Sequence, residues 1–115
     1  MDAARVAKLA VQAVEEKKGF NPVTLDLRQL TPIADYFVIT SGASTIQVQA
    51  IAERVEELLK ENGVKLLHRE GRQHDRWILL DYGGVVVHIF LEEERRFYDL
   101  ERLWGDARVV NVNSI

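Results

Sequence analysis

The segment Trp77–Ala107 decides the fold and reads WILLDYGGVVVHIFLEEERRFYDLERLWGDA. It opens with two apolar runs, Trp77–Asp81 and Val85–Phe90, which are separated by Tyr82-Gly83-Gly84. Runs rich in β-branched and aromatic residues on either side of a glycine turn are typical of paired antiparallel strands. The pattern therefore predicts a buried β-hairpin.

A two-residue turn at Gly83-Gly84 would fix which residues lie opposite each other. Ile78 then pairs with Ile89 and Leu80 with Val87 on one face, which we expect to lie in the core. The opposite face pairs Trp77 with Phe90, Leu79 with His88 and Asp81 with Val86. Either another helix covers this second face or it lies partly at a partner surface. A loop of odd length would exchange the pairs.

The residues after the hairpin predict one helix that ends near Gly105. The acids Glu92-Glu93-Glu94 suit the positive first turn of a helix. At about 100° per residue, one side of this helix holds Phe97, Leu100 and Trp104. We expect that side to pack on the core. Tyr98 and Asp99 fall away from it, so they and part of Trp104 are candidates for exposure.

The first half of the chain predicts a helix, two strands and a second helix, over Asp2–Gly19, Val23–Leu27, Asp35–Thr40 and residues 45 to about 62. Asp2, and either Ser44 or Thr45, are the expected N-caps because their side chains can accept backbone N–H groups. The first strand alternates apolar and polar residues, which predicts one buried face. The second is apolar enough to be central in a sheet.

The second half adds a short strand at Val64–His68, a polar connection at Arg69–Arg76, and the hairpin and last helix. The tail, residues 108–115, either adds a short strand or remains loose. This order predicts an α/β (α+β) fold in which helices pack on a mixed β-sheet, within a single domain over residues 1–115.

The composition narrows the class of protein. The 115 residues are 47% hydrophobic and 29% charged, as in a soluble globular domain. The absence of cysteine excludes disulfides and thiolate metal sites. A net charge of −3 argues against a broad phosphate-binding footprint. Neither a membrane-spanning run nor a secretory signal is evident, so we expect a cytoplasmic protein.

Catalytic signatures are weak. The turn Ser41-Gly42-Ala43-Ser44 lies between a strand and a helix start, where backbone N–H groups can hold a phosphate. Metal-dependent phosphoryl transfer also needs paired carboxylates, but Asp26 is followed by Arg28 and Asp81 by Gly83. We therefore favour the N-cap interpretation of the turn, with a residual phosphate site as the alternative.

The histidines do not form a metal signature. His68, His74 and His88 lack both the i, i+4 spacing and the cysteine partners of a zinc site. We interpret His88 as a hydrogen-bonded structural histidine, with Asp81 of the same hairpin as a candidate neighbour. No catalytic, cofactor-binding or metal-binding residue is predicted.

Several strings resemble, in order, those of the ribosomal silencing factors, also called the Iojap family. They are Asp35–Ile39, Ser41-Gly42, Gln47–Ala52, Trp77–Gly83, Val85–Phe90 and Arg96–Ala107. The resemblance implies a non-enzymatic factor that binds the large ribosomal subunit through protein L-fourteen. By blocking the joining of the small subunit, such a factor represses translation when nutrients are scarce. It also implies a nucleotidyltransferase-like topology and a homodimer when free. The net charge and the lack of a long apolar run argue, separately, against extensive contact with nucleic acid or membrane.

The last helix is the expected contact region. Aromatic anchors flanked by carboxylates suit a basic protein partner, although charge runs such as Glu92–Arg96 are usually solvated helix faces. The residues expected at or near the contact are Trp77, Asp81, Tyr98, Asp99, Leu100, Glu101 and Trp104. The alternatives are a nucleotide-binding or nucleotidyltransferase-like enzyme, and a small interaction module with another target.

Overall fold

A six-stranded mixed sheet forms the centre of the computed structural model, which describes residues 1–115. Its strands, in spatial order, are β3 (His68–Arg72), β4 (Trp77–Asp81), β5 (Val85–Leu91), β2 (Tyr36–Gly42), β1 (Phe20–Asp26) and β6 (Arg108–Val110). Neighbouring strands are antiparallel, except that β2 and β5 are parallel. The predicted mixed sheet is confirmed.

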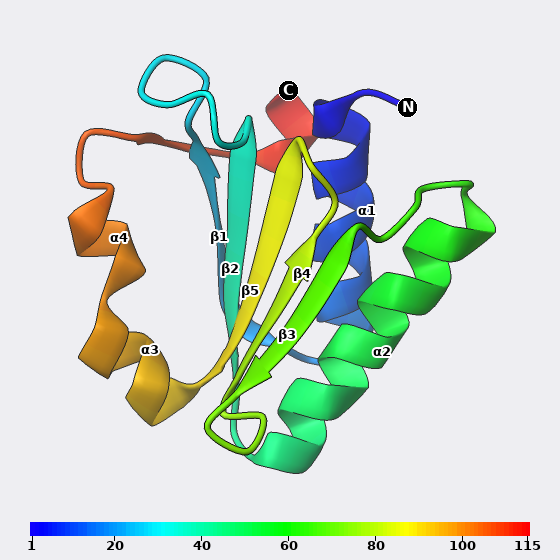
Figure 1. Ribbon diagram of the computed structural model, residues 1–115, viewed down its shortest axis with the longest axis vertical. Helices are drawn as coiled ribbons and strands as arrows, with labels where there is room; N and C mark the ends of the chain where they lie inside the picture. The colour runs from blue at the N-terminus through cyan, green and yellow to red at the C-terminus, as the bar shows by residue number, and fades with distance from the viewer.

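Helices cover both faces of this sheet (Figure 1). Helices α1 (Ala3–Glu16) and α2 (Thr45–Glu61) lie on one face, and α3 (Glu92–Tyr98) and α4 (Leu100–Leu103) on the other. The chain closes with the short 3-10 helix η1 (Val112–Ser114). The α/β class is therefore confirmed, while the nucleotidyltransferase-like topology stays a prediction. None of the helices combines the length and apolar composition that a membrane span requires.

The hairpin has the predicted register. Ile78 pairs with Ile89 and Leu80 with Val87, while Trp77 lies opposite Phe90. The Tyr82 N–H donates to the Val85 carbonyl at 2.9 Å, which closes the two-residue turn. The second face is covered by the chain's own C-terminal helices, as one of the two alternatives anticipated.

The larger core lies between the sheet and the helices α1 and α2, and contains 21 buried residues. Both helices begin at predicted N-caps: the Asp2 carboxylate accepts the Arg5 N–H at 2.8 Å, and the Ser44 hydroxyl accepts the Gln47 N–H at 3.1 Å. These caps satisfy backbone donors that a helix start leaves unpaired. Strand β2 is fully buried and lies between β5 and β1, so its predicted central position is confirmed.

Two predictions about strands were wrong. The residues 64–67 form no strand, and β3 instead spans His68–Arg72, which includes the first half of the segment expected to be a polar connection. This edge strand exposes charged side chains on both faces, so it lacks the apolar alternation that marks a half-buried strand. In β1, Thr24 and Asp26 are buried alongside Leu25, so that strand has two covered faces rather than one.

The predicted single C-terminal helix was also wrong. Asp99 adopts a left-handed conformation with φ 48° and ψ 53°, and it separates α3 from α4. The apolar side calculated for a continuous helix therefore does not exist. Phe97 is 81% exposed instead of buried, and Tyr98, expected to be exposed, packs against the sheet. The tail adds β6, which pairs with β1.

Candidate partner-binding surface

The second face of the sheet carries an aromatic cluster on which α3 and α4 rest. Trp77 stacks on Phe90 with ring centroids 4.9 Å apart, and the Tyr98 ring lies 4.8 Å from Trp77. Trp104 meets Phe37 edge to face at 5.8 Å. Rings in these arrangements add to the stabilisation that their burial gives. The cluster therefore joins both short helices to the strands.

The break at Asp99 turns two large apolar side chains outward. Phe97 is 81% exposed and Leu103 is 72% exposed. A shallow cavity of about 590 Å³ lies beside them and is lined by Arg96, Phe97, Tyr98, Asp99, Arg102 and Leu103. Exposed apolar side chains around a concave surface are a feature of protein contact sites. Sequence reasoning missed Phe97 and Leu103 because it assumed an unbroken helix.

Most of the residues expected at the contact lie together. The smaller buried cluster of the sheet's second face includes Trp77, and three more of the expected residues pack against it: Tyr98, Leu100 and Trp104. Asp81 stands apart, because it occupies the other end of β4 from Trp77 and its carboxylate accepts the Gly83 N–H at 2.8 Å. Its direct structural role is to shape the hairpin turn.

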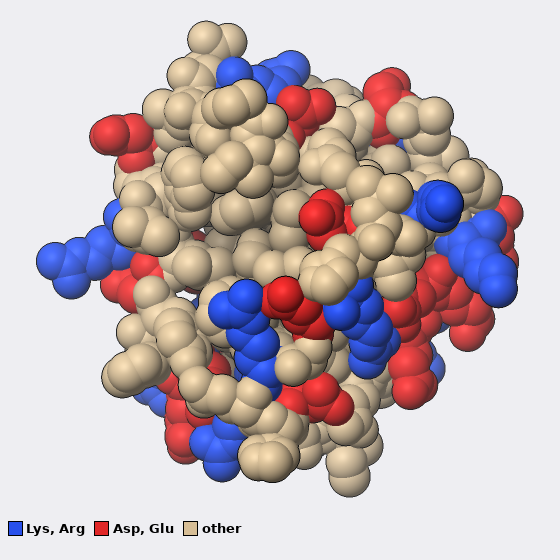
Figure 2. Space-filling view, in the orientation of Figure 1, with Lys and Arg blue, Asp and Glu red and all other residues tan.

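The carboxylates of this region are engaged within the chain. The Glu101 carboxylate accepts from Arg95 Nε at 3.0 Å, and the Glu94 carboxylate accepts from Arg76 Nη1 at 2.8 Å. On the face shown in Figure 2, acidic side chains gather over α2 at the lower right, whereas the upper left of the view is mostly uncharged. The surface is therefore less acidic than the sequence suggested.

His88 is a buried structural residue, as predicted, but its partner is Trp77 rather than Asp81. Its Nδ1 accepts the Trp77 Nε1–H at 3.2 Å, and the residue is only 4% exposed. Burial, with a smaller contribution from the nearby positive charge of Arg72, lowers the pKa of His88 to about 3. The imidazole is therefore neutral at physiological pH and orients the Trp77 ring in the cluster.

The turn Ser41–Ser44 uses its polar groups internally. Besides the cap by Ser44, the Ala43 N–H donates to Gln47 Oε1 at 2.7 Å, and the Ser41 hydroxyl accepts from Arg95 Nη1 at 3.0 Å. These bonds occupy groups that would otherwise hold a phosphate, which favours the structural interpretation of the turn.

The acidic side chains do not assemble a metal site either. The Asp26 carboxylate accepts from Arg28 Nε at 3.0 Å and Nη2 at 2.8 Å, and these bonds hold the pKa of Asp26 below its usual value. No group of three or more His, Asp or Glu side chains could hold a metal ion.

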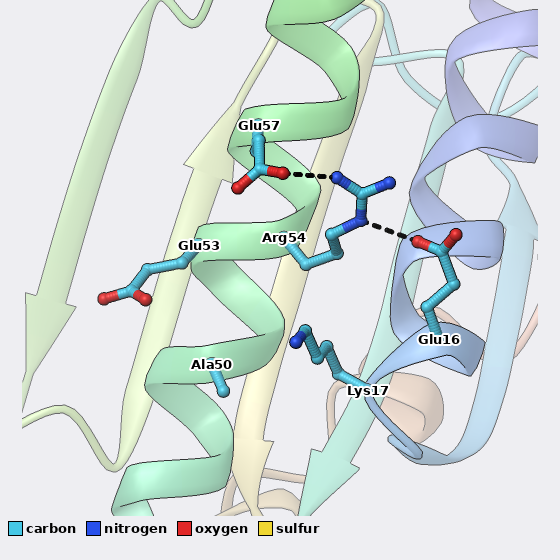
Figure 3. Close-up of a pocket in the computed structure, with 6 residues that line it drawn as sticks. All are labelled: Glu16, Lys17, Ala50, Glu53, Arg54 and Glu57. Carbon is cyan, nitrogen blue, oxygen red and sulfur yellow. Dashed lines mark hydrogen bonds and ion pairs between the residues drawn. The ribbon is translucent and has the colours of Figure 1, made fainter.

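The groove between α1 and α2 is also a structural feature (Figure 3). Arg54 of α2 donates to Glu16 of α1 at 2.7 Å and to Glu57 at 2.6 Å. Figure 3 shows the guanidinium spanning the gap between the two helices, with Lys17 and Glu53 pointing elsewhere. This exposed ion-pair network links the two helices and contributes little to stability.

Comparison with known proteins gives a consistent result. A family model described as "Ribosomal silencing factor during starvation" matches residues 1–115. This chain belongs to the ribosomal silencing factor family. Ribosomal silencing factors are ribosome-binding regulators of translation and not enzymes, so the resemblance seen in the sequence is confirmed.

Individual ribosomal silencing factors are similar over nearly the whole chain. The factor RsfS of Halalkalibacterium halodurans is 44% identical over 94% of this chain and 92% of its own length. RsfS of Bacillus subtilis is 40% identical over 98% of this chain and 96% of its own length. The crystal structure of a Chromobacterium violaceum protein is 40% identical and superposes with a TM-score of 0.88, covering 91% of this chain and 88% of that one.

Proposed function

We propose that this ribosomal silencing factor binds the large ribosomal subunit through protein L-fourteen and sterically blocks the joining of the small subunit. Translation then falls when nutrients are scarce. The observation that carries the proposal is the family match over the entire chain. Steric exclusion requires affinity for the large subunit and sufficient bulk, but no bond-making chemistry.

The proposed contact includes the aromatic cluster and the two short helices that rest on it. The residues proposed at or near this contact are Trp77, Tyr98, Asp99, Leu100, Glu101 and Trp104, together with Asp81 at the other end of β4 from Trp77. The exposed Phe97 and Leu103 add apolar area beside them. Interface energy is usually concentrated in a few aromatic or arginine side chains, so Tyr98 and Trp104 are the proposed anchors.

Sedimentation of purified subunits tests this function. Large and small subunits are mixed with and without the protein, at a magnesium concentration that permits joining. The protein should travel with the large subunit, and the joined particle should decrease. A protein that sediments with neither subunit and leaves joining unchanged would refute the proposal.

Two further properties belong to the same proposal. The free protein forms a homodimer in the cytoplasm, and its contact with the ribosome is made to protein rather than to extended RNA. The net charge of −3 supports the second point, because phosphate binding depends on clustered cationic side chains. Equilibrium sedimentation of the free protein tests the dimer.

A further inference from the structure

Arg95 is buried although it carries a permanent charge. The residue is only 7% exposed and lies in α3, between the sheet and α4. A buried guanidinium is costly unless it is paired and hydrogen-bonded. The hydrogen-bond partners of the Arg95 guanidinium therefore indicate the role of this buried charge.

Arg95 bonds to three different elements. Its Nη1 donates to the Ser41 hydroxyl of β2 at 3.0 Å and, more weakly, to the Phe20 carbonyl of β1 at 3.4 Å. On its other side, Nε and Nη2 donate to the two Glu101 carboxylate oxygens at 3.0 and 3.4 Å. Arginine presents its donors in a rigid plane, so these contacts fix direction as well as distance.

The contact with Glu101 crosses the break in the C-terminal segment. Arg95 precedes the left-handed Asp99, whereas Glu101 follows it in α4. Helix α4 has four residues, too few for an isolated helix to be stable in water. Its position depends on tertiary contacts, and Arg95 connects it directly to the two strands.

We propose that Arg95 is a positioning residue for the partner-binding surface. Its guanidinium, anchored on the sheet by Ser41, holds α4 through Glu101 and so sets Leu100 and Trp104 relative to Tyr98. Glu101 then acts as support within the chain instead of as a direct contact to a basic partner. This inference rests on the proposed function, because it assigns Arg95 to the surface that meets the ribosome.

The neighbouring Arg96 provides a matched control. Its side chain is 72% exposed, and its one ion pair, to Glu92, is long at 4.0 Å. Arg95→Lys and Arg96→Lys therefore make the same chemical change at adjacent positions, the first at a buried, hydrogen-bonded guanidinium and the second at an exposed one. Lysine keeps the charge but cannot reproduce the planar set of donors.

The test measures large-subunit affinity and local hydrogen exchange in the wild-type protein and both variants. We expect Arg95→Lys to bind the large subunit about tenfold more weakly, equal to about 1.4 kcal/mol, and Arg96→Lys, whose side chain lines the surface cavity, to keep the wild-type exchange rates of residues 100–107. Amides of residues 100–107 should exchange about tenfold faster in Arg95→Lys, while those of α2 and β5 keep their wild-type protection.

The readouts separate positioning from general stability. Equal acceleration of exchange in α2, β5 and α4 would mean that Arg95 stabilises the whole fold, which would overturn the proposal. Unchanged affinity and unchanged exchange in Arg95→Lys would overturn it too.

Glu101→Gln distinguishes support from direct contact. If Glu101 supports α4, this variant should speed exchange in residues 100–107, and its binding loss should not add to that of Arg95→Lys. Additive losses with normal exchange would assign Glu101 to the partner and contradict the proposal. If the wild-type protein binds no subunit, the proposed function fails, whereas the exchange comparison still decides whether Arg95 holds α4.

Discussion

Acidification should destabilise this protein through one residue, His88. The ring is buried against Phe37 and Trp77 and is neutral in the folded state, because burial lowers its pKa from 6.5 to about 3. In the unfolded chain the histidine regains an ordinary pKa. Below about pH 6.5 the unfolded state therefore binds a proton that the folded state does not bind, and stability falls as the pH falls.

The size of this effect follows from the difference between the two pKa values. Each pH unit in the window between them removes about 1.4 kcal/mol from the free energy of unfolding. At about pH 5 the loss should reach about 2 kcal/mol relative to pH 7. The carboxyls of Glu16, Asp26 and Glu70 have pKa values below their usual range, so their contribution is lost only at lower pH.

Urea denaturation followed by tryptophan fluorescence provides the assay, since Trp77 lies beside His88. The urea concentration at the unfolding midpoint of the wild-type protein should decrease as the pH is lowered from about 7 to about 5, while the dependence of the free energy on urea concentration stays unchanged. His88→Gln keeps an oxygen that can accept from Trp77 but does not titrate, so its midpoint should be nearly constant over the same range. An equal pH dependence in the two proteins would refute the assignment to His88.

Three other perturbations have defined outcomes. Tyr98→Ala should weaken large-subunit binding by at least about 2 kcal/mol, roughly thirtyfold, if Tyr98 is an anchor; unchanged binding by folded variant protein would remove it from the contact. Phe97→Ala should change the free energy of unfolding by less than about 0.5 kcal/mol, because the residue is 81% exposed. If Phe97 were buried, as a continuous helix predicted, the same substitution would lower the free energy of unfolding by about 3 kcal/mol or more. Ser44→Ala should lower thermal stability by about 1 kcal/mol through loss of the α2 cap, and no shift in a melting experiment would contradict the capping role.

The hairpin could be read from the sequence because its signals are local. Gly83-Gly84 fixes the turn length, and the turn length fixes every pair from Asp81 to Trp77. The N-caps are likewise local, since a serine or aspartate three residues before a free backbone N–H needs no tertiary partner to be effective. These features were predicted correctly.

The break at Asp99 and the strand β3 could not be read in the same way. Aspartate tolerates the left-handed conformation, but it adopts it only where surrounding contacts favour it. Here the left-handed Asp99 accompanies the packing of Tyr98 against Trp77. Strand β3 gains its conformation by pairing with β4, although its own residues are polar. In both cases long-range contacts override a pattern within the segment.

The candidate site shows the same limit. The aromatic members Trp77, Tyr98 and Trp104 were singled out by residue type, and they do gather on one face. The role of Arg95 was not visible, because its partners Ser41 and Phe20 are far from it in sequence. The acids of this segment were interpreted as a solvated face and as contacts to a basic partner, yet Glu94 and Glu101 are each paired with an arginine of the same chain.

The parallel pairing of β2 with β5 determines when this protein can become functional during its own synthesis. Tyr36 lies opposite Val85, so the central pair of the sheet joins residues roughly 50 positions apart in the chain. A nascent chain that has emerged only as far as α2 holds β1 and β2 but lacks the strand that covers β2 on its other side. The segment that carries Tyr98 and Trp104 follows β5 directly. The sheet and the surface proposed to bind ribosomes are therefore completed together, only after β5, α3, α4 and β6 have left the ribosome that made them.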